Sequence, residues 1–182
     1  MRGSAFPPLT DVDWDERART VSTSWGVALW SERGQTLRFV AALRYLDLRP
    51  GDSLLDFGCG TGRFSEFLPP YVDYVGTDAS PEMLARARRE HQRARFIDLA
   101  MIDDGDYGHV VALGVWNVSR EDPWDELVGL WSRASRTLTA SLHRDRFSPV
   151  RVAAFVQTLS PAPAFLIDGS YLDNDLLLVL RR

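Results

Sequence analysis

The 182-residue sequence contains no lysine, so all 21 of its Lys/Arg side chains are arginines. It therefore offers no lysine for a Schiff base, for anchoring pyridoxal phosphate or for a nucleotide-binding P-loop. Its single cysteine excludes an internal disulfide and gives no sign of a disulfide-stabilised secreted fold. The formal net charge of −4 argues against a dedicated nucleic-acid-binding protein.

Long apolar segments are absent as well. No run approaches the roughly 18 consecutive apolar residues of a membrane helix, and residues 1–8 lack the apolar core of a signal peptide. We therefore expect a cytoplasmic protein without a membrane partner. The three histidines, at positions 91, 109 and 143, are scattered and show no metal-ligand spacing, so no metal site is predicted.

Apolar runs and helix-start signals alternate along the chain. The patterns predict strands at 53–57, 71–77, 95–97, 109–115 and 137–142. They predict helices at 32–46, 63–68 and 80–92, with two more beginning near 123 and 149. A closing hairpin is predicted from residues 164–172 and 175–181. The expected fold class is α/β, a single doubly wound, mostly parallel seven-stranded sheet with helices on both faces and a C-terminal antiparallel hairpin.

This predicted domain takes up residues 31–182. Residues 1–30 are irregular and rich in tryptophan, with one short predicted helix over 13–20, and we expect them to form an N-terminal lid or cap. A loop is predicted at 103–106. Doubly wound sheets bind ligands beyond the carboxyl ends of their strands, so functional residues are expected just after each of the first five strands.

A glycine-rich loop follows the first predicted strand. Gly58, Gly60 and Gly62 allow the backbone to turn sharply and to approach a ligand closely. Asp78 ends the second strand, 20 residues after Gly58, where an acid can bind ribose hydroxyls. Such a loop could also serve packing alone, or hold a nicotinamide or flavin dinucleotide. The G-x-G-x-G spacing argues against a dinucleotide, and so does Asp56, whose carboxylate would repel a pyrophosphate.

Residues 54–62, LLDFGCGTG, resemble motif I of the class I S-adenosylmethionine-dependent methyltransferases. The resemblance continues through residues 75–78 (VGTD), 80–84 (SPEML) and 107–111 (YGHVV), and it covers about residues 30–182. It implies S-adenosylmethionine as the cofactor and S-adenosylhomocysteine as the product.

The resemblance also implies roles for single residues at the glycine loop and the strand ends. Asp56 and the backbone of residues 58–60 would hold the methionine moiety of the cofactor. Asp78 would hold both ribose hydroxyls, and Asp98 would accept from the adenine amino group. Ile97 stands where the family often has a glycine before that last acid.

Further implied cofactor contacts lie beside these. Ala79 and Met83 would lie near the adenine, and Leu113 and Gly114 would line the sulfonium side. Arg38, on the helix before the first strand, would pair with the cofactor carboxylate. The loop residues Cys59, Gly60 and Gly62 complete the set; Cys59 is interpreted as a small buried side chain and not as a nucleophile.

The methyl acceptor is expected near the ends of the fourth and fifth strands. Residues 116–119, WNVS, differ from the Asp/Asn-Pro-Pro-Tyr/Phe sequence of the family's amino-methylating enzymes. Trp25, Trp30, Trp116 and Asn117 are predicted to line the substrate pocket. His143, after the fifth strand, is the candidate general base for a protic acceptor. A surface histidine at a strand end is the alternative interpretation.

The sequence thus predicts transfer of a methyl group to a small-molecule or peptide acceptor by in-line displacement, which needs both reactants aligned in a water-poor pocket. There are two alternative functions. The protein could be a regulatory subunit that binds the cofactor without methylating, or an enzyme that carries out other chemistry on the same cofactor. No nucleic-acid partner is expected. The pocket would be closed by the first 30 residues, by short loops or by a second subunit, so a homodimer is compatible with the sequence.

Overall fold

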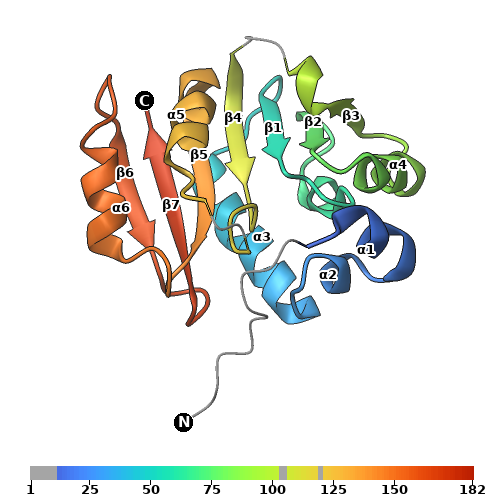
Figure 1. Cartoon of the computed structure of the whole chain (residues 1–182). Coiled ribbons are helices and arrows are strands. Elements are labelled where there is room, and N and C mark those ends of the chain that lie inside the picture. The colour runs from blue at the N-terminus through green and yellow to red at the C-terminus, as the bar shows by residue number, and fades with distance from the viewer. Residues whose placement is uncertain (1–11, 103–105, 119–120) are drawn as a thin grey trace.

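The structure, a computed structural model, describes residues 12–102, 106–118 and 121–182. Its sheet contains seven strands, β1 (Ser53–Phe57), β2 (Asp73–Asp78), β3 (Arg95–Asp98), β4 (Tyr107–Ala112), β5 (Ala134–His143), β6 (Ala164–Asp168) and β7 (Asp175–Arg181). Their order across the sheet is β3-β2-β1-β4-β5-β7-β6 (Figure 1). The first five strands are parallel to one another, whereas β7 runs antiparallel to both β5 and β6.

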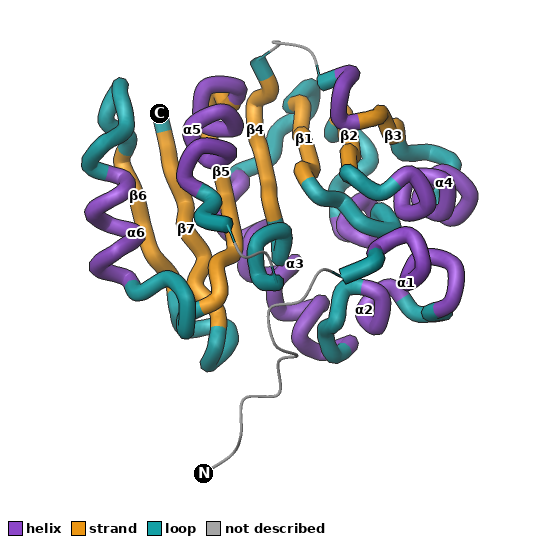
Figure 2. Tube along the Cα trace, in the orientation of Figure 1, coloured by secondary structure: helices purple, strands orange, loops and turns teal. Residues whose placement is uncertain are grey.

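In the described part of the chain, six α-helices and two short 3-10 helices connect and cover the strands (Figure 2). The α-helices are α1 (Trp14–Thr20), α2 (Ser24–Val27), α3 (Glu32–Leu46), α4 (Pro81–Glu90), α5 (Trp124–Arg133) and α6 (Pro149–Val156). The 3-10 helices are η1 (Arg63–Phe67) and η2 (Leu99–Met101).

Two apolar cores lie on the two faces of the sheet. Successive strand residues point to opposite faces, so Leu55 joins the core beneath α5 and α6, whereas Leu54 joins the core beneath α3 and α4. The same alternation divides the buried leucines and valine of strand β7 between the two cores. The sheet is therefore covered on both sides, as expected of parallel strands that carry continuous apolar runs.

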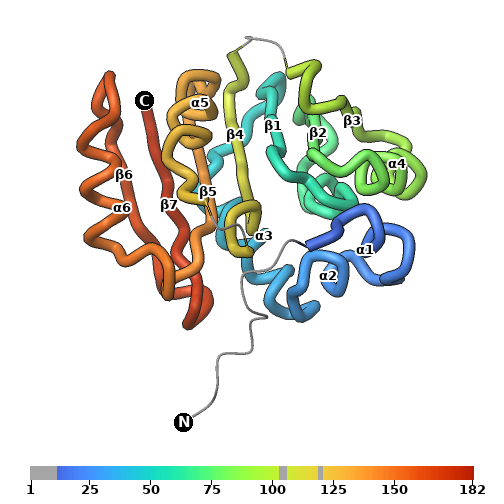
Figure 3. Tube along the Cα trace, viewed as in Figure 1, coloured from blue at the N-terminus to red at the C-terminus, as the bar shows by residue number. Residues whose placement is uncertain are grey.

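The order of the strands creates the place for a ligand. The chain enters the sheet at β1, moves outward to β2 and β3, and then returns to β4 on the other side of β1. A crevice opens at the carboxyl ends of β1 and β4, because the connections there run in opposite directions. In Figure 3 the N-terminal segment, α1 and α2, lies below these carboxyl ends and beside α4.

The predicted fold class is confirmed, including the C-terminal antiparallel hairpin. The bounds of α3 and β1 agree with the predicted 32–46 and 53–57. Strand β4, predicted at 109–115, ends at Ala112 because the chain turns at Gly114, whose φ is 80°. The predicted loop at 103–106 falls largely outside the described residues, as do the first 11 residues of the N-terminal segment. No described helix has the length and apolar character needed to cross a membrane.

Candidate functional site

A cavity of about 270 Å³ lies at the carboxyl ends of β1, β2 and β4; we call it the main cavity. Its floor is the glycine loop after β1, and its sides come from the ends of β2 and β4 and from η1. Residues of the N-terminal segment form another side, among them Trp14, Val27 and Trp30. The crevice predicted by the topology is thus a closed-in space bounded by segments far apart in the sequence.

The glycine loop is shaped by left-handed backbone and tied to β2. Gly58, Gly60 and Gly62 have φ values of 71°, 55° and 77°, a region that favours glycine. The amide of Gly60 donates to Oδ2 of Asp78 at 2.8 Å, and the amide of Ser80 donates to Oδ1 of the same carboxylate at 2.9 Å. Asp78 therefore holds the loop and the start of α4 together, while it also lines the main cavity.

A second carboxylate, Asp56, lies at the end of β1 in a strongly desolvated position. Its pKa is raised to about 7, mainly by burial and to a smaller extent by the nearby charge of Asp78. The hydroxyl of Tyr74, which donates to Oδ2 of Asp56 at 2.7 Å, acts in the opposite direction. Burial also raises the pKa of Asp78. Within the described residues no cationic side chain forms an ion pair with Asp56, so this part of the main cavity favours a positively charged ligand group.

The cysteine of the loop has the properties of a packing residue. Burial raises the pKa of the Cys59 thiol well above its usual value, and the carboxylates of Asp56 and Asp78 raise it further. A nucleophilic cysteine needs the reverse, a stabilised thiolate.

The structure brings most of the implied cofactor residues to one place. Ten of the residues singled out from the sequence line the main cavity: Trp30, Asp56, Gly58, Cys59, Gly60, Asp78, Ala79, Met83, Leu113 and Gly114. The remaining seven do not line it: Trp25, Arg38, Gly62, Asp98, Trp116, Asn117 and His143.

Arg38 lies just behind the cavity wall. Its side chain is only 4% exposed, and its Nε atom lies 2.5 Å from Oδ2 of Asp175, at the start of β7. Its guanidinium also stacks over the indole of Trp30, 4.5 Å from the ring centroid. Arg38 thus supports the wall that Trp30 forms. Gly62 stands at the start of η1, where an added Cβ would meet the ring of Phe96.

Asp98 and His143 occupy different surroundings from those expected. The side chain of Asp98 is 65% exposed and pairs with Arg88 at 3.1 Å, and it does not line the main cavity. His143 is buried, and its Nδ1 accepts from the amide of Asp145 at 3.3 Å. The neighbouring Leu99, in η2, lines the main cavity in place of Asp98.

The four predicted substrate-pocket residues are dispersed. Trp25 lines a second, more polar cavity of about 430 Å³ between α2, η1 and the end of α4. Trp116 is buried; its ring stacks on Phe57, and its Nε1 donates to Glu126. Asn117 is buried next to it, and neither of its side-chain amide atoms has a hydrogen-bond partner among the described residues. Of the four, only Trp30 reaches the main cavity.

Several residues that line the main cavity carry no signal in the sequence. Arg63 follows the glycine loop, and Glu126 comes from the first turn of α5. Trp14 and Gln35 come from α1 and α3. Each reaches the cavity through tertiary packing. The sequence shows that Glu126 is an acid near a helix start and that the N-terminal segment is rich in tryptophan, but neither feature indicates a cavity.

Trp30 occupies the space that a side chain at position 114 would need. A Cβ added to Gly114 would lie 2.1 Å from Cζ2 of Trp30, whereas one added to Gly51, also at positive φ, meets nothing within 4 Å. We therefore expect Gly114→Ala to lower the free energy of unfolding by about 1–3 kcal/mol more than Gly51→Ala, because only the first replacement adds overpacking to backbone strain. Urea denaturation of the two variants measures this difference. Equal losses would show that Trp30 moves aside freely.

Comparisons with known proteins agree with this geometry. Residues 55–140 match the family described as "Methyltransferase domain". A 62-residue stretch of the chain is 36% identical to part of an uncharacterised 37.1 kDa protein from a transposon of Streptomyces fradiae. The match covers 32% of this chain and 18% of that protein.

Solved structures share the fold. Magnesium protoporphyrin IX methyltransferase from Synechocystis PCC 6803, crystallised with S-adenosylmethionine, superposes with a TM-score of 0.60 at 21% identity, covering 95% of this chain and 86% of that one. A putative methyltransferase in complex with the Trm112 activator of Haloferax volcanii gives 0.67 at 16% identity, covering 94% and 98%. Plantazolicin methyltransferase in complex with a substrate analogue and S-adenosylhomocysteine gives 0.66 at 15% identity, covering 93% and 88%. Residues 55–140 therefore match a methyltransferase domain, and the solved structures show the same fold over almost the whole chain.

Proposed function

We propose that this protein binds S-adenosylmethionine in the main cavity and transfers the methyl group to a small-molecule or peptide acceptor. The observation that carries the proposal is the pairing of a buried carboxylate, Asp56, and a half-buried one, Asp78, with a glycine loop at the strand switch point. The related structures with porphyrin and plantazolicin methyltransferase activity support an acceptor of either kind.

The chain's residues fit the cofactor. Asp56 offers a buried carboxylate with a neutral hydrogen-bond donor as its partner, which suits the ammonium and sulfonium charges. Asp78 would accept from the ribose hydroxyls, since each carboxylate oxygen that already receives one amide has a further lone pair. An added Cβ at Gly60 would enter open space, so the backbone of the loop faces the cavity directly. When bound, the cofactor supplies an activated methyl group on sulfur.

The acceptor side of the cavity is formed by Trp30, Val115 and Glu126. Aromatic and aliphatic groups there would exclude water and align the acceptor. The carboxylate of Glu126 is oriented by the indole NH of Trp116, and it would attract a cationic acceptor or receive a proton from a protic one. The N-terminal segment would close this side of the cavity, which is the lid role expected of residues 1–30. Closure of the cavity by a second subunit, in a homodimer, is a further proposal.

The proposal is tested by titration and by product analysis. We expect isothermal titration to detect binding of S-adenosylmethionine, and mass spectrometry of an acceptor screen to detect S-adenosylhomocysteine with an acceptor heavier by one methyl group. Absence of binding at millimolar cofactor would refute it. Binding without any methylated product would favour a regulatory subunit, and methylthioadenosine as the product would favour other chemistry on the cofactor.

Asp78 is the residue whose replacement should affect cofactor binding directly. We expect Asp78→Ala to weaken binding of S-adenosylhomocysteine by about 1–3 kcal/mol, roughly 5- to 150-fold, because a charged acceptor of ligand hydroxyls is lost. Calorimetry measures the change. Asp73→Ala, an exposed position at the other end of β2, is the matched control and should leave the affinity unchanged. An unchanged affinity in Asp78→Ala would contradict the ribose assignment.

A further inference from the structure

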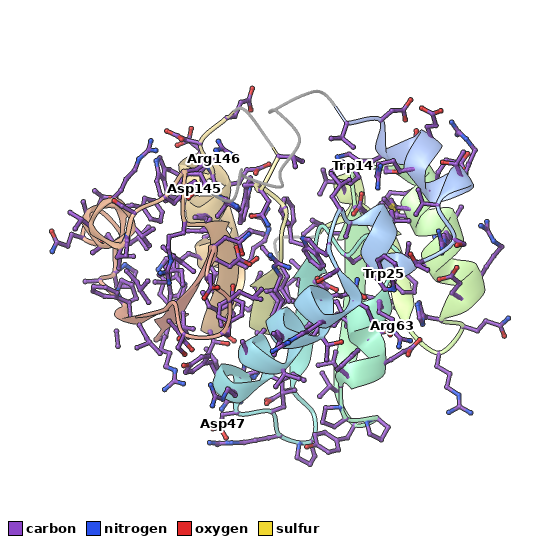
Figure 4. All side chains as sticks on the ribbon, turned by 90° about the horizontal axis from the view of Figure 1, so that it is seen from below. Trp14, Trp25, Asp47, Arg63, Asp145 and Arg146 are labelled. Atoms are coloured by element: carbon purple, nitrogen blue, oxygen red, sulfur yellow. The ribbon has the colours of Figure 1, made fainter. Side chains whose placement is uncertain are left out.

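Trp14 forms part of the cavity wall at the end defined by Asp78. The main cavity is lined there by Ala79, Met83 and Leu99 as well as by Trp14, so this end is mostly apolar. Trp14 also packs against the small cluster that Met83 forms with two residues of the N-terminal segment. It is the first residue of α1, far in sequence from the strands that build the rest of the site. Figure 4, seen from below the carboxyl ends, shows Trp14, Trp25 and Arg63 on the same side of the molecule.

The residue after Trp14 anchors α1 to the start of α4. The carboxylate of Asp15 accepts from the hydroxyl of Ser80 and, at 3.3 Å, from the amide of Glu82. These two residues are the N-cap and the first turn of α4, where a carboxylate is favoured by the unpaired amides. The bond from Ser80 lowers the pKa of Asp15, so the anchor is ionised at neutral pH. Ser80 itself directly follows the Asp78–Ala79 pair.

The far end of α1 is fixed to α4 as well. The guanidinium of Arg86, a buried residue, donates to the carbonyls of Val21 at 2.5 Å and of Ser22 at 2.6 Å. Its Nε pairs with Glu90 at 2.6 Å. With anchors at both ends, α1 holds the indole of Trp14 in a defined place over the cavity.

We propose that Trp14 is a binding residue for the purine ring of the ligand, held in place by Asp15. The inference rests on the proposed function, since it concerns the same cavity. A planar heteroaromatic ring at this end would lie against the indole and contact the apolar side chains that line the same end, Ala79, Met83 and Leu99, and stacking on an aromatic side chain stabilises any base. The ribose would then reach Asp78.

The charge at this end narrows the ligand class. Asp15 lies close enough to Asp78 for its negative charge to raise the pKa of that second carboxylate. Two acids beside the nucleoside position disfavour a phosphate there. The end of the cavity therefore suits an adenosine whose ribose carries a thioether or sulfonium group, and it disfavours adenosine phosphates.

Tryptophan fluorescence tests the assignment. We expect S-adenosylhomocysteine, and adenosine at higher concentration, to change the emission of the wild-type protein and of Trp25→Phe, whose indole lines the other cavity. The change caused by adenosine, which would not extend to Trp30 at the acceptor side, should be lost in Trp14→Phe, which keeps an aromatic ring and should bind within about threefold of the wild type. Trp14→Ala should bind roughly 5- to 150-fold more weakly by calorimetry. AMP should bind more weakly than adenosine.

The outcomes separate this inference from the proposed function. If adenosine binds the wild type but its fluorescence change persists in Trp14→Phe, or if Trp14→Ala, shown by circular dichroism to be folded, binds S-adenosylhomocysteine as tightly as the wild type, Trp14 is not a purine-binding residue. The proposed function would stand in that case. Preferred binding of AMP over adenosine would likewise overturn the inference. If the wild-type protein binds neither S-adenosylhomocysteine nor S-adenosylmethionine, the inference and the proposed function both fail.

Discussion

Arg38→Met is expected to lower the free energy of unfolding by about 3–5 kcal/mol, because it leaves the Asp175 carboxylate buried without its partner. The Asp175 side chain is 0% exposed, so water cannot replace the lost arginine as a partner of its carboxylate. The variant would therefore carry the full cost of burying an unpaired charge. The loss should diminish as the pH is lowered, since an uncompensated buried carboxylate takes up a proton more readily in the folded than in the unfolded state. Urea denaturation at several pH values measures both effects.

Two further variants complete this experiment. Arg44→Met replaces an exposed arginine on the same helix, and we expect a change within about 0.5 kcal/mol. Arg38→Met combined with Asp175→Asn should be more stable than Arg38→Met alone at neutral pH, because the unpaired charge is then absent. A loss in Arg38→Met no larger than in Arg44→Met would show that the pair contributes nothing. If Arg38→Met also binds S-adenosylhomocysteine as the wild type does, the carboxylate contact expected from the sequence is not made.

Local signals explain why much of the fold could be predicted. Helix α3 begins after Ser31, whose hydroxyl accepts from the amide of Gly34, and helix α4 begins with Ser80 followed by Pro81. These caps act within one turn of the chain and are legible in the sequence. Helix α2 is only four residues long, which is too short for an apolar repeat to show in the sequence. Thr23 caps it, and it packs beside α3.

The candidate site likewise has a part that could be predicted from the sequence and a part that depends on tertiary packing. The glycine loop and Asp78 could be found because their chemistry is tied to fixed positions after β1 and β2. The partner of Arg38 lies 137 residues away, at the start of a strand, and no spacing rule connects the two. The predicted substrate residues dispersed for the same reason: Trp116 lies after β4 as expected, but its indole packs on Phe57 inside the core.

Cofactor affinity is expected to depend steeply on pH through Asp56. The pKa of this buried carboxyl is raised to about 7 in the free protein, so below pH 7 the carboxyl is mostly protonated and offers no negative charge to the ligand's ammonium group. Because the bound cation lowers that pKa, binding expels a proton, and the affinity should fall about tenfold per pH unit below pH 7. Between pH 7 and pH 5 the expected loss approaches about 50-fold, or about 2.3 kcal/mol, because the carboxyl is already half protonated at pH 7. Above about pH 8 the ligand's own α-amino group loses its proton, so the affinity should decline again.

Calorimetry of S-adenosylhomocysteine in two buffers of different ionisation enthalpy would count the protons released, which should be close to one at pH 6 and close to none near pH 7.5, where proton uptake by the ligand's α-amino group cancels the release. Asp56→Asn removes the titrating group, so the variant should bind more weakly at pH 7 and show no decline from pH 7 to pH 5. Tyr74→Phe provides a second check. Loss of the hydroxyl that donates to Asp56 should raise the carboxyl pKa further and move the decline to higher pH. An affinity that stays constant from pH 7 to pH 5 in the wild type would show that Asp56 is already ionised there, or that it does not face the ligand's charge.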